Sequence, residues 1–232
     1  MTAAVLVAGS RGGMGGSVVA ELGRKGVLVA GFDRGEFDIA SPGGAASAVE
    51  WALRAYGEIS GVVHAIGMSG RGLGDGSILE CTDEAWTEVH RVNLQSVFRL
   101  LRAAMPALIE RGGGSVVVIG SGLASTLDDD FLTVAYTAAK GALFPLVRSA
   151  AFTGARHGVR VNLVSPGVVD TAMAARAIKD PEISARLVDL QPLAAGPQSP
   201  ESVAATVAWL LSEESRAITG ADVPADGGWT LR

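Results

Sequence analysis

The stretch Ala3-Ala4-Val5-Leu6-Val7-Ala8-Gly9-Ser10-Arg11-Gly12-Gly13-Met14-Gly15 decides the fold of this chain. A short apolar run ends at glycines, and helical periodicity follows from Met14 to Lys25, so we expect a strand, a turn and a helix. Glycines let a backbone turn sharply and approach a pyrophosphate, whose charge a helix N-terminus stabilises. A glycine-rich turn alone can also be a plain strand-to-helix connection, so further residues must decide its role.

Apolar runs and amphipathic stretches alternate along the rest of the chain. Strands are predicted at 26–32, 59–66, 115–119, 159–164 and 221–224, and helices at 42–56, 83–111, 134–157 and 199–211. Strands that are apolar on both faces and separated by helices indicate a parallel sheet covered on both sides. The predicted fold class is therefore α/β, a doubly wound, mostly parallel sheet in a single domain over residues 1–232. The stretch 171–199 follows a strand end and is expected to be a substrate lid.

Composition and charge exclude several classes of protein. Of the 232 residues 48% are hydrophobic and 19% charged, which is typical of a globular chain. The net charge of -5 without a basic run argues against nucleic acid and anionic membranes as partners. One cysteine, Cys81, and three scattered histidines, His64, His90 and His157, favour neither a disulfide framework nor a metal site. No membrane span or signal peptide is predicted, so we expect a cytoplasmic protein.

Asp33 bears on the choice of cofactor. It lies about 20 residues beyond the glycine-rich turn, at the end of the second predicted strand, where a carboxylate can accept hydrogen bonds from both hydroxyls of an adenosine ribose. The same charge would repel a 2′-phosphate, whereas Arg34 could pair with one. We give Asp33 more weight, so NAD is the expected cofactor and NADP the less favoured one.

Tyr136 and Lys140 form the expected reactive pair. A spacing of four residues places the phenol and the ammonium on one face of the helix that begins near Val134. A lysine nearby in a partly desolvated cleft would favour the phenolate and so lower the tyrosine pKa from about 10. An ordinary solvated pair has the same spacing, so the neighbours of the two residues matter.

Two further polar residues are candidates for the same site. Ser121 follows the strand at 115–119 and so lies at the carboxyl edge of the sheet, where ligands of open parallel sheets bind. Asn93 lies in an apolar part of a predicted helix, where its amide needs a partner. Ser121 could instead cap a turn, and Asn93 could instead be a core amide satisfied by the backbone.

As a set, these residues resemble the classical short-chain dehydrogenase/reductase family. The resemblance covers nearly the whole chain and implies a Rossmann-like fold. The resemblance implies that Asn93, Ser121, Tyr136 and Lys140 are catalytic. It also implies cofactor contacts by Gly9, Arg11, Gly13, Met14, Gly15, Asp33, Asp38, Ile39, Ala65, Gly67, Tyr136, Lys140, Val169 and Thr171. No metal is implied.

The activity implied by the resemblance is the interconversion of a secondary alcohol and a ketone by hydride transfer with a nicotinamide cofactor. Tyr136 would move the hydroxyl proton, Ser121 would hydrogen-bond the substrate oxygen, and Lys140 would hold the nicotinamide ribose. Asn93 would fix a water molecule that links Lys140 to solvent. A homodimer or homotetramer is implied as well. The alternatives are an NADP-dependent 3-oxoacyl-thioester reductase and a non-catalytic dinucleotide-binding regulator.

The sequence departs from the family pattern at three places. His64-Ala65-Ile66-Gly67 replaces the usual Asn-Asn-Ala-Gly, and Ala8 replaces a threonine before the glycine-rich turn. The spacing between Ser121 and Tyr136 is longer than usual, which leaves Ser125 as a second candidate for the catalytic serine.

Two features bear on the substrate. Four apolar side chains of the expected lid, Met173, Ile178, Leu187 and Leu190, either indicate a lipophilic alcohol or ketone or simply pack a helix onto the sheet. The acidic run Asp128-Asp129-Asp130 would lie near the mouth of the pocket and disfavour an anionic substrate.

Overall fold

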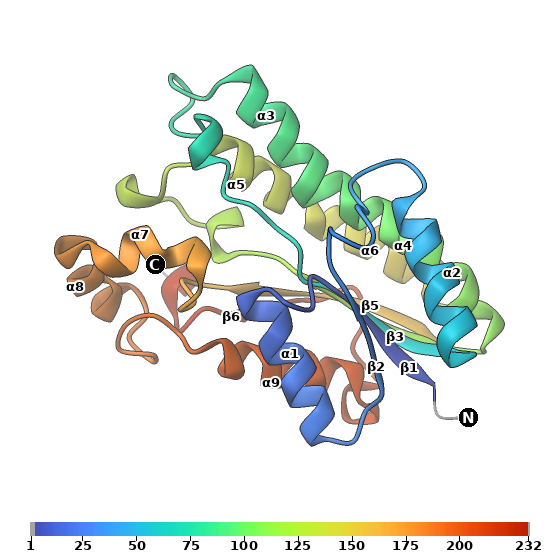
Figure 1. Cartoon of the computed structure of the whole chain (residues 1–232). Helices are drawn as coiled ribbons and strands as arrows, with labels where there is room; N and C mark the ends of the chain where they lie inside the picture. The colour runs from blue at the N-terminus through green and yellow to red at the C-terminus, as the bar shows by residue number, and fades with distance from the viewer. Residues whose placement is uncertain (1–2, 232) are drawn as a thin grey trace.

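A single parallel sheet organises the part of the chain that the computed structural model describes, residues 3–231 (Figure 1). Its strand order is β2-β1-β3-β4-β5-β6. The strands are β1 (Ala4–Ala8), β2 (Val29–Phe32), β3 (Ile59–His64), β4 (Gly114–Ile119), β5 (Val159–Pro166) and β6 (Asp222–Ala225). The order confirms the doubly wound α/β fold. The predicted domain, 1–232, extends beyond the described residues at both ends.

Helices cover both faces of the sheet (Figure 1). The pair α1 (Gly13–Arg24) and α9 (Pro200–Leu211) lies on one face, and α2 (Gly44–Tyr56), α4 (Ser96–Glu110) and α6 (Leu143–Ala155) lie on the other. Alternate residues of one strand serve the two cores: Leu6 packs with the second group, and Val5 and Val7 pack with the first. No helix within residues 3–231 is long and apolar enough to cross a membrane.

The long helix predicted over 83–111 is interrupted. It comprises α3 (Asp83–His90), a π-helical segment (Arg91–Gln95) and α4. The helix predicted over 134–157 likewise consists of α5 (Val134–Gly141) and α6. π-Helical turns are rare in proteins, and those that occur are often at functional sites. This one contains Asn93.

The expected lid contains two short helices, α7 (Ala175–Lys179) and α8 (Pro181–Leu190). They lie beyond the carboxyl edge of the sheet, at the left of Figure 1. Leu187 is fully buried in a small core with Phe131 and Trp229, and Leu190 packs against that core. Of the two readings of the apolar lid residues, packing is therefore the correct one for Leu187 and Leu190.

Candidate active site

A cavity of 370 Å³ opens at the carboxyl edge of the sheet. It is lined by nine of the residues proposed from the sequence: Gly13, Met14, Ala65, Gly67, Ser121, Tyr136, Lys140, Val169 and Thr171. These residues come from segments that are far apart in the chain but meet because the carboxyl ends of parallel strands share one edge. The lining does not include Gly9, Arg11, Gly15, Asp33, Asp38, Ile39 or Asn93.

The glycine-rich turn has little room for side chains. Gly9 has a φ of +86°, in the left-handed region that favours glycine. A Cβ atom on Gly15 would lie 2.0 Å from the carbonyl oxygen of Gly9, and one on Gly13 would lie 2.8 Å from Thr171 Cγ2. The helix α1 begins at Gly13, and no side chain caps its N-terminus. These residues fit a dinucleotide, because bare backbone N–H groups at a helix N-terminus suit a pyrophosphate.

Asp33 lies at the end of β2, close to the turn. Its Oδ2 atom accepts hydrogen bonds from Arg11 N at 2.8 Å and from Ser10 Oγ at 3.1 Å. The Arg11 guanidinium is held beside it by Glu36 at 2.5 Å, and this contact lowers the pKa of Glu36 to about 2. Asp33 keeps one carboxylate oxygen, Oδ1, without a hydrogen bond from residues 3–231. Neither Ser10 nor Glu36 was a sequence-based candidate.

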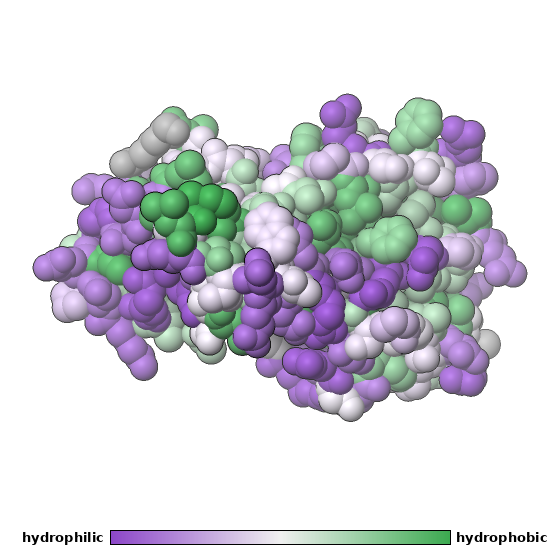
Figure 2. All heavy atoms as spheres, turned by 90° about the horizontal axis from the view of Figure 1, so that it is seen from above, coloured by the Kyte–Doolittle hydropathy of each residue, from purple (hydrophilic) through white to green (hydrophobic). Residues whose placement is uncertain are grey.

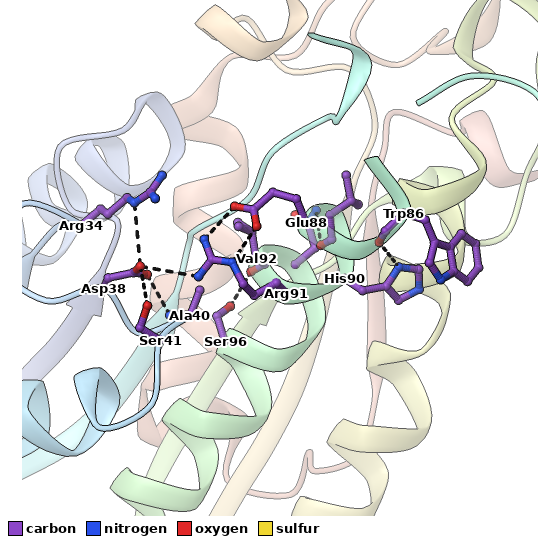
Figure 3. Close-up of polar contacts among 12 residues, drawn as sticks. Arg34, Asp38, Ala40, Ser41, Trp86, Glu88, His90, Arg91, Val92 and Ser96 are labelled. Carbon is purple, nitrogen blue, oxygen red and sulfur yellow. Dashed lines mark hydrogen bonds and ion pairs between the residues drawn. The ribbon is translucent and has the colours of Figure 1, made fainter. Parts of the chain in front are cut away.

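Asp38 and Ile39 differ from each other in what they can contact. The Ile39 side chain is only 1% exposed and belongs to the core, so any contact it makes with a ligand has to come from its backbone. Asp38 accepts hydrogen bonds from Ser41 Oγ at 2.8 Å and Ala40 N at 3.0 Å (Figure 3). These hydrogen bonds and the nearby arginines hold the pKa of Asp38 below its usual value, although burial acts in the opposite direction.

Arg34, the residue that argued for NADP, points toward Asp38, with 4.0 Å between Nε and Oδ2 (Figure 3). Arg91 approaches the same carboxylate at 3.5 Å and is held by two hydrogen bonds to Glu88 (Figure 3). In the described residues Arg34 therefore pairs with Asp38 and not with Asp33.

Tyr136, Lys140 and Ser121 meet in the cavity. The Lys140 ammonium is 3% exposed and donates a hydrogen bond of 2.7 Å to the carbonyl of Ile119 at the end of β4. Burial lowers the pKa of Lys140 to about 8. Burial also raises the pKa of Tyr136, and hydrogen bonding with the Ser121 side chain opposes that rise. The pKa of Tyr136 is thus raised, where the sequence led us to expect a lowered value, because desolvation has the larger effect.

The two candidate serines are clearly distinguished. Ser121 lines the cavity, and its Oγ also accepts a hydrogen bond from Leu123 N at 3.2 Å, so the hydroxyl caps a short turn as well. Ser125 is exposed and does not line the cavity. The geometry therefore favours Ser121 for contact with a substrate.

Asn93 is fully buried in the π-helical turn. Its amide donates to Met68 O at 2.9 Å and Val89 O at 3.1 Å, and its Oδ1 accepts from Met68 N at 3.0 Å. This is the backbone-satisfied amide that the sequence left open as an alternative. A Cβ on Gly67 would lie 3.0 Å from Asn93 Oδ1 and 3.7 Å from Lys140 Nζ, so Asn93 lies close behind the cavity wall.

His64 joins β3 to the same π-helical turn. Its Nε2 lies 2.7 Å from Ser96 Oγ, and the Ser96 hydroxyl donates to Val92 O at 2.5 Å. A hydroxyl has one proton, and that of Ser96 is donated to Val92 O. His64 Nε2 is therefore the donor in its hydrogen bond with Ser96 Oγ. Its buried Nδ1 has no hydrogen-bond partner within residues 3–231, and burial lowers the pKa of His64 to about 3.

Four further residues with distant partners lie at the site and were not predicted from the sequence. The buried Asp75 accepts hydrogen bonds from two backbone N–H groups in the first turn of α5. Gln191 accepts a hydrogen bond from Val168 N and donates one to Val168 O. Arg71 and Arg176 line the cavity. No local pattern marks these residues, because their partners lie 23 to 61 residues away in the chain.

The sequence is similar to those of known oxidoreductases. The model of the family described as enoyl-(acyl carrier protein) reductase matches residues 4–230. Galactitol 2-dehydrogenase (L-tagatose-forming) of Cereibacter sphaeroides is 34% identical over 153 residues, which cover 66% of this chain and 60% of that protein. The 2-(S)-hydroxypropyl-CoM dehydrogenase 3 of Xanthobacter autotrophicus is 32% identical over 215 residues, 91% of this chain and 80% of that protein.

A solved structure extends the comparison to nearly the whole chain. The short-chain type dehydrogenase/reductase from Mycobacterium ulcerans superposes with a TM-score of 0.89 at 28% identity, covering 99% of this chain and 90% of that one. The first sequence relative is covered over less than two thirds of its length, whereas this structure is covered over most of its length.

Proposed function

Because the chain belongs to the classical short-chain dehydrogenase/reductase family, we propose that it interconverts a secondary alcohol and a ketone with NAD as cofactor. One observation carries the proposal: Ser121, Tyr136 and Lys140 line a single cavity together with the glycine turn at the N-terminus of α1. A silent dinucleotide-binding regulator has no need of this convergence. The bound nicotinamide would supply or accept the hydride.

The chain's own residues handle the proton and the substrate oxygen. Tyr136, whose raised pKa keeps it protonated at neutral pH, donates a proton to the ketone oxygen in reduction and takes it back in oxidation. Ser121 donates a hydrogen bond to the same oxygen and stabilises the charge that develops there. Lys140 binds the nicotinamide ribose, and its positive charge favours the phenolate when Tyr136 gives up its proton. Asn93 holds the backbone of Met68 behind this group.

The preference for NAD rests on the environment of Asp33. Its free Oδ1 atom is available to a ribose hydroxyl, and its charge opposes a 2′-phosphate. The Arg11 guanidinium lies between Asp33, at 3.4 Å, and Glu36, at 2.5 Å, so two carboxylates share this one cation and the cluster keeps a net negative charge. The same features argue against an NADP-dependent 3-oxoacyl-thioester reductase.

The lid and the assembly belong to the proposal as well. Arg176 and Ala177 of α7 line the cavity, as does Met173 before it, and Thr171 reaches the glycine turn, so the stretch 171–199 would act as the substrate lid through this part. Figure 2 shows the molecule from above, with hydrophobic areas between hydrophilic ones. Exposed aromatic side chains on α3, α4 and α6, those of Trp86, Phe98, Phe144 and Phe152, favour pairing with other copies in a homodimer or homotetramer.

The test is a spectrophotometric panel of secondary alcohols and ketones with NAD(H) and NADP(H). We expect turnover with NAD(H), and we expect Tyr136→Phe to lose most of it while NADH still binds. Tyr56→Phe is the matched control, because Tyr56 is the chain's other tyrosine and packs on Trp51 at the far end of α2. Equal activity of Tyr136→Phe and the wild type would refute the assignment.

A further inference from the structure

Two arginines stand in the cavity without an acidic partner. Arg71 and Arg176 both line it, and neither side chain lies within 4.0 Å of a carboxylate in residues 3–231. Lys140 is the third cation of the lining, and the lining contains no Asp or Glu from the described chain. The wall of the cavity therefore carries positive charge only.

The two guanidinium groups converge on one acceptor. Arg71 donates to the carbonyl of Asp130 at 3.2 Å, and Arg176 donates to the same oxygen. Each group has five N–H donors, so most of them remain unused. Bringing two cations to one neutral oxygen is unfavourable, and both burial and the nearby Arg176 lower the pKa of Arg71. A bound anion would relieve this repulsion and use the free donors.

Two of the three carboxylates in the acidic run that was expected to repel an anion are paired with a cation. Arg186 of α8 binds the carboxylates of Asp128, at 2.6 Å, and Asp130. Asp75, the acid that most affects Arg71, is committed to two backbone N–H groups of α5. The third carboxylate of the run, Asp129, is exposed and does not line the cavity, so the run gives little reason to exclude an anionic substrate.

The position of the arginines points to the substrate rather than to the cofactor. Their hydrogen bonds go to the segment that precedes α5, the helix of Tyr136, and Arg176 lies over the ring of Phe131 at 5.9 Å. The fit for a pyrophosphate is at a different element, the N-terminus of α1 at Gly13 and Met14. The volume of 370 Å³ is near the lower end of the usual range for ligand sites, about 300–1,000 Å³, and it has to admit the nicotinamide as well.

Building on the proposed function, we infer that the substrate is a short hydroxy acid or oxo acid, whose anionic group binds between Arg71 and Arg176. In the reducing direction the ketone carbon takes a hydride from NADH, and the ketone oxygen takes a proton from Tyr136. The products are the hydroxy acid and NAD. The anionic group is not consumed; it orients the carbonyl toward Ser121 and Tyr136.

The experiment compares oxo acids with their neutral amides, which have nearly the same shape. The probes are 3-oxobutanoate, 4-oxopentanoate and 5-oxohexanoate, each with its amide, and NADH consumption gives kcat and KM. We expect at least one acid to exceed its amide in kcat/KM by about 10- to 100-fold, as one or two charged hydrogen bonds allow. That preference should fall away in Arg71→Met and Arg176→Met, because KM rises much more for each acid than for its matched amide, and NADH affinity is measured alongside. Arg176→Lys should retain part of it.

Arg186→Met is the matched control. It loosens the same 128–131 segment but removes no cation from the lining, so it should affect acids and amides equally. Amides reduced as well as or better than acids at every chain length would overturn the inference and leave the proposed function standing. Equal losses for acids and amides in the Arg71 and Arg176 variants, or a parallel loss of NADH affinity, would also overturn it. If neither acids nor amides are reduced, binding of the acids to the enzyme–NADH complex is measured instead. Acids that do not bind would overturn the inference.

Discussion

The carboxylate of Asp75 accepts a hydrogen bond of 3.0 Å from the backbone N–H group of Tyr136, although 61 residues separate them in the chain. Its other oxygen accepts from Ala135 N at 2.9 Å, and the carbonyl of Gly76 accepts from Val134 N at 2.8 Å. The first turn of α5 is therefore capped by a distant loop rather than by the residue that precedes it. A carboxylate at this end also suits the helix dipole.

Removing this cap should disturb the helix that carries Tyr136 and Lys140. We expect Asp75→Ala to lower the free energy of unfolding by about 1–2 kcal/mol and to reduce kcat, with little change in NADH affinity. Asp75→Asn keeps one acceptor and should fall in between. Denaturant unfolding and steady-state kinetics measure both effects. Ser199→Ala, which removes the cap of α9 on the other side of the sheet, should cost stability without lowering kcat.

Two adjacent glycines of α1 should respond in opposite ways to alanine. In Gly15→Ala the new Cβ would lie 2.0 Å from Gly9 O, so the turn must shift, at a cost of about 1–3 kcal/mol and with weaker NADH binding. In Gly16→Ala the nearest atom is at 3.6 Å, and the helix should gain about 0.5–1 kcal/mol. Thermal unfolding and NADH titration compare the two variants. Equal effects would show that the turn is not held by this close approach.

Asp33 and Glu36 should set the choice between the two cofactors by different means. Asp33→Ser removes a ribose acceptor and the repulsion of a 2′-phosphate, so the NADH-to-NADPH affinity ratio should fall by about tenfold or more. Glu36→Gln leaves Asp33 in place but releases Arg11, and it should strengthen NADPH binding with little effect on NADH. Fluorescence titrations with both nucleotides give the ratios. An unchanged ratio in both variants would contradict the role of this cluster.

His64 should make folding sensitive to acid. Its pKa is about 3 in the folded chain against 6.5 for a free group, so below pH 6.5 the unfolded chain takes up a proton that the folded chain does not. The contribution of the neutral His64 to the free energy of unfolding is therefore fully present above pH 6.5. It is lost as the pH falls from there toward 3, by up to about 1.4 kcal/mol per pH unit.

The measurement is the free energy of unfolding across this pH window for the wild type and His64→Asn. The asparagine variant does not titrate here, so its pH slope should be smaller than that of the wild type. His157→Asn replaces an exposed histidine and should leave the slope as it is. If His64→Asn and the wild type show parallel slopes, then His64 does not stay neutral in the fold.

Much of the fold follows from local patterns in the sequence. The parallel sheet could be predicted because its strands are apolar on both faces and alternate with helices. Where prediction failed, longer-range packing was responsible. The π-helical turn at Arg91–Gln95 breaks an otherwise regular helical pattern, and the side chain of Ile39 lies in the core, which leaves only its backbone for the expected cofactor contact. The lid helices α7 and α8 pack into the small core around Leu187. The sequence pattern of that stretch did not predict this packing.

By itself, the sequence determined the glycine turn, the position of Asp33 at a strand end, and the shared helical face of Tyr136 and Lys140. Each of these depends on backbone geometry over a few residues or on where a strand ends. Three contacts depend instead on the tertiary structure: Asp75 caps α5, Ser96 accepts a hydrogen bond from His64, and Arg71 and Arg176 both donate to the carbonyl of Asp130. Those contacts join segments 32 to 61 residues apart, and they exist because the register of the sheet and the packing of the helices bring the segments together.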